Sequence, residues 1–460
     1  MSANPNSKAA PVAAASAPGA SASKAPQLRR VLGLAALVMF GLSYMAPVTV
    51  FTTFGTVTEI TDGHLAAAYV VALVTMIFTA LSYAHLSRVI PAAGSAYSYA
   101  QKTFGGHLGF VTGWTLMLDY LFLPMINFLL VGLYMNSAFP AIPAWVFALV
   151  SIVVVLAFIA MGVKFVGKSS GVIVAMAVAI IVVFVALSIS YLVGNPAPSV
   201  LAPFEFGSDG ASPIFAGAAV LALSFLGFDA VSTLSEDARD AQRNIPRAIV
   251  ITTVLGGVIF IVVAWVGGMV FPDWHSFVAL DTAGIELVEK VGGPVLSAIF
   301  IAVFVAGCIG SAMTSQVSVS RIIYAMGRDG LLPRAFGKLH PRFGTPVLAA
   351  VSVSAVSLLA LVLSLEMAAT MISFGALFAF SMVNLSVIKH FFWDSKLRGA
   401  AAAVKYLLLP LVGFALTIWL WTSLAPTSFI VGLCWMAVGI IFLAFRTKGF
   451  RQAPPKLTFG

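Results

Sequence analysis

Long apolar stretches separated by short polar segments recur along the chain from about residue 31 to residue 445. Runs of 18 or more apolar residues are typical of helices that cross a membrane, whereas a membrane β-barrel shows alternating segments of about 10 residues. We therefore predict an all-α membrane protein with twelve transmembrane helices. The predicted spans are 31–57, 66–90, 108–138, 144–163, 171–193, 213–235, 247–271, 294–320, 346–365, 368–390, 403–423 and 428–445.

Two predicted spans contain residues that interrupt a helix. In the first span Pro47 follows Ala46, and proline removes a backbone donor and clashes with the preceding turn. In the sixth span Gly227 interrupts the run 224–229. A simple proline kink would explain Pro47 alone, but the two breaks lie five spans apart, as an inverted repeat of spans 1–5 and 6–10 requires. Such a matched pair of interruptions indicates the binding site of a transporter.

Composition and charge agree with this topology. The chain is 60% hydrophobic and only 9% charged, so a water-soluble fold could not cover its own surface. With the N-terminus inside, 24 of the 25 lysines and arginines fall on inner segments, and only Lys290 falls outside. We therefore predict both termini on the cytoplasmic side of the plasma (bacterial inner) membrane. The net charge of +9 then reflects orientation in the lipid bilayer, and we expect no nucleic-acid partner.

Two acids remain inside predicted spans, Asp119 and Asp229. A charge at the centre of a membrane helix costs about 3 kcal/mol, so it usually faces a cavity or a partner. Asp229 beside the second break could neutralise an amine or carry a proton; the alternative is an aspartate that only packs helices together. Tyr120 follows Asp119, and an aromatic ring attracts cations. Because neighbours on a helix point about 100° apart, we expect only one of these two side chains to face the site squarely.

Other features carry less chemistry. Span 8 is rich in hydroxyls that could bind sodium, but such residues also mediate ordinary helix packing, which is the interpretation we favour. The stretch 91–109 is predicted to be a flexible cytoplasmic connector. The sequence has no phosphate-binding loop, nucleophile elbow, paired catalytic acids or metal-ligand spacing, so we expect neither an enzyme nor a cofactor.

Several motifs resemble the amino acid–polyamine–organocation (APC) transporter superfamily, and in particular its bacterial putrescine importers. They are PAAGSAYSYAQKTFGGHLGFVTGW (91–114), SFLGFDAVSTLSEDARDAQRNIPRAI (224–249), SRIIYAMGRDGLLPRAF (320–336), MAPVTVF (45–51), TDGH (61–64), LDYLFLPMIN (118–127) and FGALFAFSMVNLSV (374–387). The resemblance covers residues 30–450 and implies a five-plus-five inverted-repeat (LeuT-like) fold with discontinuous helices 1 and 6. The implied units are 1–27 (a disordered cytoplasmic tail), 28–193 (first repeat), 213–390 (second repeat), 403–445 (helices 11 and 12) and 446–460 (a cytoplasmic tail).

The resemblance also implies where a substrate binds. The backbone of the two breaks would surround it, Asp229 would supply an acid, and Tyr120 would influence selection. One departure concerns Thr52, where the putrescine importers often have an aspartate. The proposed substrate-binding residues are Ala46, Pro47, Val48, Thr49, Thr52, Tyr120, Asn127, Ser224, Phe225, Gly227 and Asp229, and the candidates for proton coupling are Asp229 and Asp119.

We therefore predict a secondary importer of a small cationic amine such as putrescine, working by alternating access and driven by protons rather than sodium. An importer of an amino acid or a monoamine with the same fold is the alternative, favoured by Thr52. A substrate sensor is a third hypothesis, and the lack of a sizeable soluble signalling domain argues against it.

Overall fold

The computed structural model describes residues 31–92, 94–161, 163–195, 199–204, 210–328, 330, 332–341, 344–363 and 365–451. The predicted tail 1–27 and the last residues of the predicted tail 446–460 lie outside them. Every extended regular element of the described chain is a helix. Ten helical stretches are long and apolar enough to cross a membrane, and shorter apolar helices at 144–159 and 347–361 fall on the predicted fourth and ninth spans. The all-helical membrane architecture is thus confirmed, while the count of twelve crossings stays a prediction.

The helices follow the predicted spans closely. The α-helices are α1 (Leu34–Met45), α2 (Phe54–Ile60), α3 (Leu65–Val89), α4 (Ser95–Phe104), α5 (Gly106–Ala138), α6 (Ala144–Ala160), α7 (Val163–Gly194), α8 (Ser212–Leu221), α9 (Ala241–Val270), α10 (Ala283–Arg328), α11 (Val347–Ser357), α12 (Leu365–Val387), α13 (Ala400–Ala403), α14 (Leu409–Thr422) and α15 (Pro426–Arg446). The 3₁₀ turns are η1 (Pro47–Phe51), η2 (Ala202–Phe204), η3 (Ala222–Phe225), η4 (Ala230–Leu234), η5 (Trp274–Ser276), η6 (Leu280–Thr282), η7 (Arg334–Gly337) and η8 (Leu358–Leu361), and π-helical turns occupy η9 (Ile388–Asp394) and η10 (Val404–Leu408).

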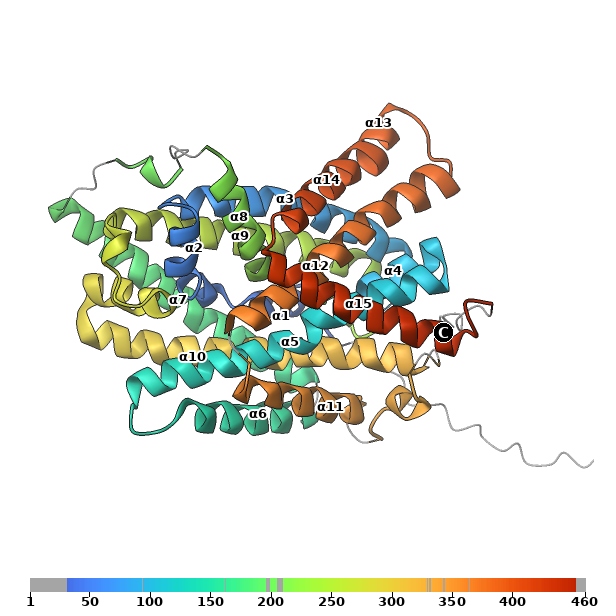
Figure 1. The fold of residues 1–460 in the computed structure, drawn as a ribbon, viewed down its shortest axis with the longest axis horizontal. Helices are drawn as coiled ribbons and strands as arrows, with labels where there is room; N and C mark the ends of the chain where they lie inside the picture. The colour runs from blue at the N-terminus through green and yellow to red at the C-terminus, as the bar shows by residue number, and fades with distance from the viewer. Residues whose placement is uncertain are drawn as a thin grey trace, which may run out of the picture.

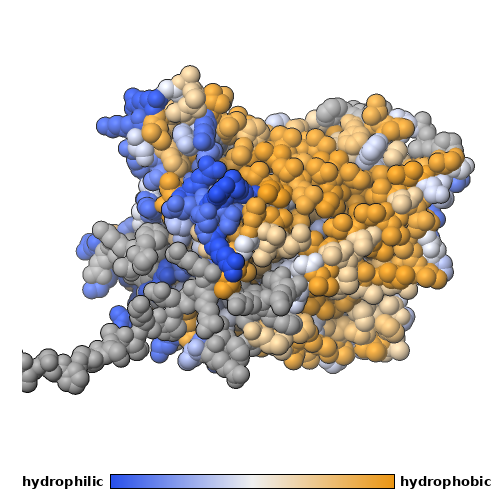
Figure 2. All heavy atoms as spheres, turned by 180° about the vertical axis from the view of Figure 1, so that it is seen from behind, coloured by the Kyte–Doolittle hydropathy of each residue, from blue (hydrophilic) through white to orange (hydrophobic). Residues whose placement is uncertain are grey.

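The long helices α5 and α10 lie side by side across the molecule, with α6 and α11 along one flank and α12 on the other side of α5 (Figure 1). The helices α3 and α9 pack together, and α1 contacts α7, α9 and α10. Figure 2 shows a broad hydrophobic face that gives way to a hydrophilic end. This division suits a surface that meets lipid along its length and water at its ends.

The first predicted span is interrupted where Pro47 stands. The helix α1 ends at Met45, Ala46 adopts a left-handed conformation (φ 44), and the chain continues as the 3₁₀ turn η1 before α2 begins. Left-handed backbone is unusual for a residue with a Cβ atom, so surrounding packing must hold it in place. The predicted discontinuity of the first span is confirmed.

The sixth span is interrupted for longer. The helix α8 ends at Leu221, the turn η3 follows, Leu226 is extended, and Gly227 has φ 132. The chain then resumes as the turn η4 rather than as an α-helix. The predicted discontinuity is confirmed here also, and it places Asp229 directly before the resumed turn.

A third irregularity lies in α10. Gly293 has φ 66 and is followed by Pro294, so a short helix of ten residues precedes the long membrane helix. Only glycine adopts this conformation without strain. The predicted span 294–320 therefore begins where the long helix begins.

The prediction of a flexible connector at 91–109 is wrong over its central part. Residues 95–104 form α4, and Ser95, Tyr97 and Tyr99 are buried. The helix packs against α5, α12 and the turn η4. Tyrosines spaced two apart among small residues did not suggest a membrane span, but their rings give the helix enough apolar surface to be buried against neighbours.

At one end of the molecule the segment before α1 is joined to the segment after η4. The Val31 and Leu32 amides donate to the Asp237 carbonyl at 2.7 and 3.1 Å, and the Arg239 amide donates to the Leu32 carbonyl at 2.8 Å. Beside this junction Asp237 forms a buried ion pair with Arg321 of α10. Burial raises the pKa of the Asp237 carboxyl, and the Arg321 guanidinium opposes part of that rise. Backbone hydrogen bonds and one ion pair therefore hold these segments together at this end.

Candidate functional site

Asp229 lies at the second break and is almost fully buried, with 1% of its surface exposed. Its Oδ2 atom accepts a hydrogen bond of 2.5 Å from the Tyr120 hydroxyl of α5, and its Oδ1 atom accepts one of 3.2 Å from the Gly227 amide. Tyr120 is buried and meets the ring of Tyr44 edge to face at 6.2 Å. The structure thus brings Tyr120, Asp229 and the Gly227 backbone into one contact network, as the sequence predicts for binding residues.

The two breaks touch one another. A Cβ atom on Gly227 would lie 2.8 Å from the Gly41 carbonyl oxygen and 2.9 Å from the Met45 amide nitrogen. Only a glycine permits this approach, and its φ of 132 also excludes side chains. Gly227 therefore serves both as the interruption of the sixth span and as the place where it meets α1.

The carbonyl freed at the first break has a partner from α10. The Ser311 hydroxyl donates to the Tyr44 carbonyl at 2.6 Å, and the Asn127 side-chain amide donates to the Ser311 hydroxyl at 3.1 Å. This chain of bonds joins α1, α5 and α10. Asn127 thus acts on the first break through Ser311, and it stays a predicted substrate-binding residue that no observation tests.

The other hydroxyls of α10 mostly bond within their own helix. Thr314 donates to the Gly310 carbonyl at 2.9 Å, Ser315 to the Ala312 carbonyl at 3.1 Å, and Ser320 to the Gln316 carbonyl at 2.7 Å. This pattern agrees with helix packing. Ser311 differs because it reaches across to the broken backbone of α1.

Sequence reasoning missed Tyr69 of α3. Its hydroxyl lies 3.0 Å from the Thr53 hydroxyl and 3.4 Å from the Ser224 hydroxyl, so it joins the far side of the first break to the second break. A tyrosine in an otherwise apolar span was the available signal, because a buried phenol needs a polar partner. The partner of Ser224 could not be read from the sequence, since 155 positions separate it from Tyr69.

The remaining predicted residues line the first break or pack behind the second. Thr49 and Thr52 are half-buried, and each hydroxyl donates to a backbone carbonyl of the same break, at 3.2 Å to Met45 and 2.6 Å to Thr49 respectively. Val48 and Phe225 are fully buried, and the Phe225 ring meets Phe260 of α9 edge to face. These contacts stabilise the breaks, and whether each residue also touches a substrate stays a prediction.

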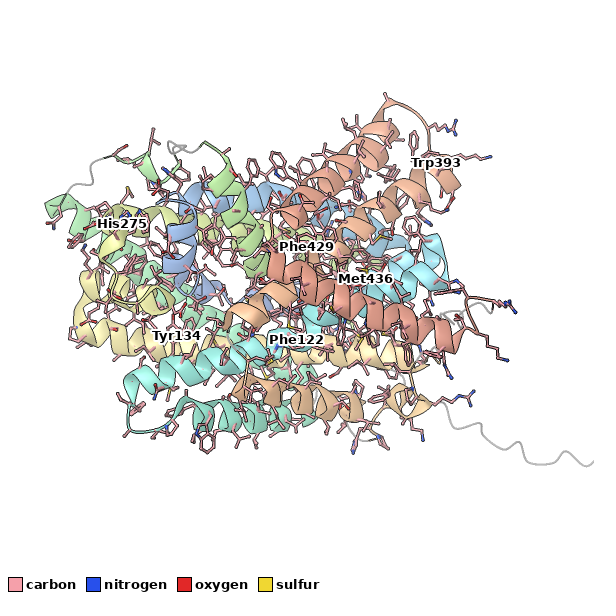
Figure 3. The ribbon with its side chains drawn as sticks, viewed as in Figure 1. Phe122, Tyr134, His275, Trp393, Phe429 and Met436 are labelled. Atoms are coloured by element: carbon pink, nitrogen blue, oxygen red, sulfur yellow. The ribbon has the colours of Figure 1, made fainter. Side chains whose placement is uncertain are left out.

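Asp119 behaves differently from Asp229. It is fully buried near the middle of α5, and neither carboxylate oxygen has a hydrogen-bond partner among the described residues. Figure 3 labels Phe122, one turn further along this helix, near the centre of the molecule. Tyr120 thus bonds Asp229 whereas Asp119 has no such bond to a described residue, and the expectation that only one of the two faces the site squarely stays a prediction.

Tyr44, Tyr120 and Asp229 are all buried. A cavity of about 180 Å³ lies elsewhere, lined in part by Phe54, His64, Phe271 and Trp274, and no predicted site residue lines it. His275, next to Trp274, is labelled near one end of the molecule in Figure 3, far from Trp393 at the opposite end.

Comparisons with known proteins agree with this geometry. The amino acid permease family matches residues 36–449. The chain is 41% identical over 437 residues to the low-affinity putrescine importer PlaP of Escherichia coli, covering 94% of this chain and 96% of that protein. It is 28% identical to the methylthioribose transporter of Bacillus subtilis, covering 93% and 95% of the two chains. It is 27% identical to the branched-chain amino acid permease BcaP of Lactococcus lactis, covering 91% and 95%.

These matches span nearly the whole described chain and confirm the resemblance to APC transporters and putrescine importers. The relatives are transporters rather than enzymes. The chain therefore belongs to the amino acid permease family of membrane transporters.

Proposed function

We propose that the protein is a secondary active importer of a small cationic amine of the putrescine class, driven by a proton gradient. The observation that carries the proposal is the buried Asp229 carboxylate at a helix break, held by Tyr120 and the Gly227 amide. A buried anion of this kind is the natural partner of an ammonium group, and the surrounding tyrosine rings add cation–π attraction. The 41% identity to a putrescine importer over 437 residues supports the same substrate class.

The mechanism we propose is alternating access about two inverted repeats, 28–193 and 213–390, in a bacterial inner membrane with both termini cytoplasmic. The matched breaks at Ala46–Pro47 and Gly227 support the repeats, because each falls in the first helix of its half. Asp229 is the proposed carrier of the coupled proton. The α10 hydroxyls give a sodium site less support, since Thr314 and Ser315 donate within their own helix.

The direct test is uptake of radiolabelled putrescine into proteoliposomes that hold the purified protein under an inward pH gradient. We expect accumulation above that of empty vesicles, and loss of accumulation when a protonophore collapses the gradient. Absence of putrescine uptake from a sample that transports another ligand would refute the substrate. Uptake that follows a sodium gradient instead would refute only the proposed coupling ion.

An amino-acid or monoamine importer is the rival proposal. It is favoured by Thr52, which offers a hydroxyl but no charge at the first break, and by the relationship to a branched-chain amino acid permease. A panel of thermal-shift ligands separates the two. Diamines without a carboxylate should raise the unfolding temperature only under the first proposal, and amino acids or monoamines only under the rival.

A further inference from the structure

The Asp119 carboxylate is the most costly unpaired group near the proposed site. It is fully buried, and both of its oxygens lack a hydrogen-bond partner in the part of the chain that the structure describes. Asp229 by contrast accepts bonds from Tyr120 and the Gly227 amide. Because buried polar groups are almost always bonded, and a buried unpaired charge is costlier still, Asp119 requires a partner that a bound ligand can supply.

The two acids belong to one buried cluster. Asp119 directly precedes Tyr120 in α5, and the Tyr120 hydroxyl donates to Asp229. The Tyr120 ring meets Tyr44 of α1 edge to face at 6.2 Å. Tyr83 of α3 meets Phe228, the neighbour of Asp229, at 5.7 Å. The Tyr44 hydroxyl is also buried, and no hydrogen-bond partner for it occurs among the described residues. The cluster therefore joins one acid that already has donors to a second acid and a phenol that do not.

The helix α12 packs closely against the backbone of α5 at Asp119. A Cβ atom on Gly375 of α12 would lie 3.2 Å from the Asp119 amide nitrogen, so α12 packs directly on the backbone of α5 at this point. This packing keeps water from the α5 backbone at Asp119 in this conformation. The carboxylate is then neutralised where it lies, by a proton or by a cation that enters the cluster.

We propose that Asp119 and Asp229 receive the two ammonium groups of a diamine, and that Asp119 thereby sets the preference for a diammonium over a monoammonium substrate. An ammonium offers three hydrogen-bond donors and a positive charge, and the Asp119 carboxylate oxygens can accept those hydrogen bonds. This proposal rests on the proposed function. It also assigns the second anion to α5 rather than to the first break, where Thr52 carries no charge.

The test compares putrescine with n-butylamine, which has the same four-carbon chain and one ammonium. Kd values are measured by calorimetry on purified wild type, Asp119→Asn and the control Asp62→Asn, which alters an exposed acid. Truncating one partner of a buried charge pair weakens binding on the order of 10- to 100-fold or more. We expect Asp119→Asn to raise the Kd for putrescine by that factor, while its Kd for butylamine stays within about threefold of the wild-type value. Asp62→Asn should change neither Kd.

A second variant keeps the charge. Asp119→Glu lengthens the arm, so the proposal predicts that the preference for diamines survives and that the optimum moves from putrescine toward 1,3-diaminopropane. Ligand-free thermal unfolding checks that both variants fold. An unchanged ratio of the two Kd values in Asp119→Asn would overturn the proposal, and so would an equal loss of both amines, which indicates a proton-carrying or structural aspartate. If wild type binds no putrescine at all, the proposed function itself has failed.

Discussion

The two helix breaks at the site offer different chemistry. At the first break the backbone carbonyls accept hydrogen bonds from nearby hydroxyls. The Ser311 hydroxyl donates to the Tyr44 carbonyl, and the Thr49 and Thr52 hydroxyls donate to the Met45 and Thr49 carbonyls. At the second break the Gly227 amide donates to a carboxylate in the same segment, that of Asp229. The first break is therefore neutral and its backbone is hydrogen-bonded, whereas the second holds a carboxylate that can pair with a cation.

This difference follows from the residues that make each interruption. Pro47 has no backbone N–H, so one carbonyl of the preceding turn loses its partner, while the chain continues as a short 3₁₀ turn. Nearby hydroxyls can then donate to the free carbonyls. Gly227 opens a longer stretch between α8 and η4 and lets the amide turn toward Asp229. A proline break thus mainly shapes the backbone, and a glycine break here also presents a charged group.

The largest effect is expected from Gly227→Ala. The new Cβ atom would meet the Gly41 carbonyl at 2.8 Å, and alanine disfavours a φ of 132. Backbone strain of this kind costs about 1–3 kcal/mol, and overpacking adds about 1–3 kcal/mol. Thermal unfolding in detergent should show a marked loss of stability. Gly210→Ala is the matched control, because Gly210 also has positive φ and no described residue lies within 4 Å of its Cβ position. Equal losses in the two variants would show that the contact between the breaks is unimportant.

Asp229→Asn should come next. The change keeps the shape of the side chain and removes the charge, so putrescine binding should weaken by about 2–5 kcal/mol while the fold survives. This is roughly 30-fold to several thousandfold in Kd. Uptake into proteoliposomes should fall accordingly and lose its dependence on the pH gradient. If Asp229→Asn transports putrescine at the wild-type rate and with the same pH dependence, Asp229 has no role in the mechanism. The two breaks would then not differ in function.

The smallest effect is expected from Ser311→Ala. It leaves the Tyr44 carbonyl without its 2.6 Å donor in a buried position, at a cost of about 1–3 kcal/mol. Ser315→Ala is the control, because that hydroxyl bonds only a carbonyl of its own helix. The two variants are compared by thermal unfolding and by putrescine Kd. If Ser315→Ala lowers stability as much as Ser311→Ala does, the hydrogen bond from Ser311 to the Tyr44 carbonyl does not stabilise the first break.

The sequence predicted what is local and periodic. Apolar runs located the helical spans, Pro47 and Gly227 located both interruptions, and the low charge of the spans left Asp119 and Asp229 as the acids to explain. These inferences succeed because each depends on a residue and its immediate neighbours. The family resemblance added Tyr120, whose bond to Asp229 the structure contains.

The contacts that could not be predicted join distant segments. Tyr69 bonds across to Ser224, and Ser311 bonds back to Tyr44, across 155 and 267 positions respectively. No periodicity or composition distinguishes these partners from other hydroxyls in the same helices. The buried helix α4 was missed for a related reason, since it is buried by segments elsewhere in the chain, among them α5, α12 and the turn η4.

The junction before α1 has a mechanical consequence. The chain around α1 is fastened to the sixth-span segment twice: at Gly227, which lies against Gly41 and Met45, and at the paired backbones of Leu32 and Arg239. Two attachment points along one helix prevent it from pivoting independently about either. A rigid rotation of α1 about one attachment point would therefore break the contacts at the other.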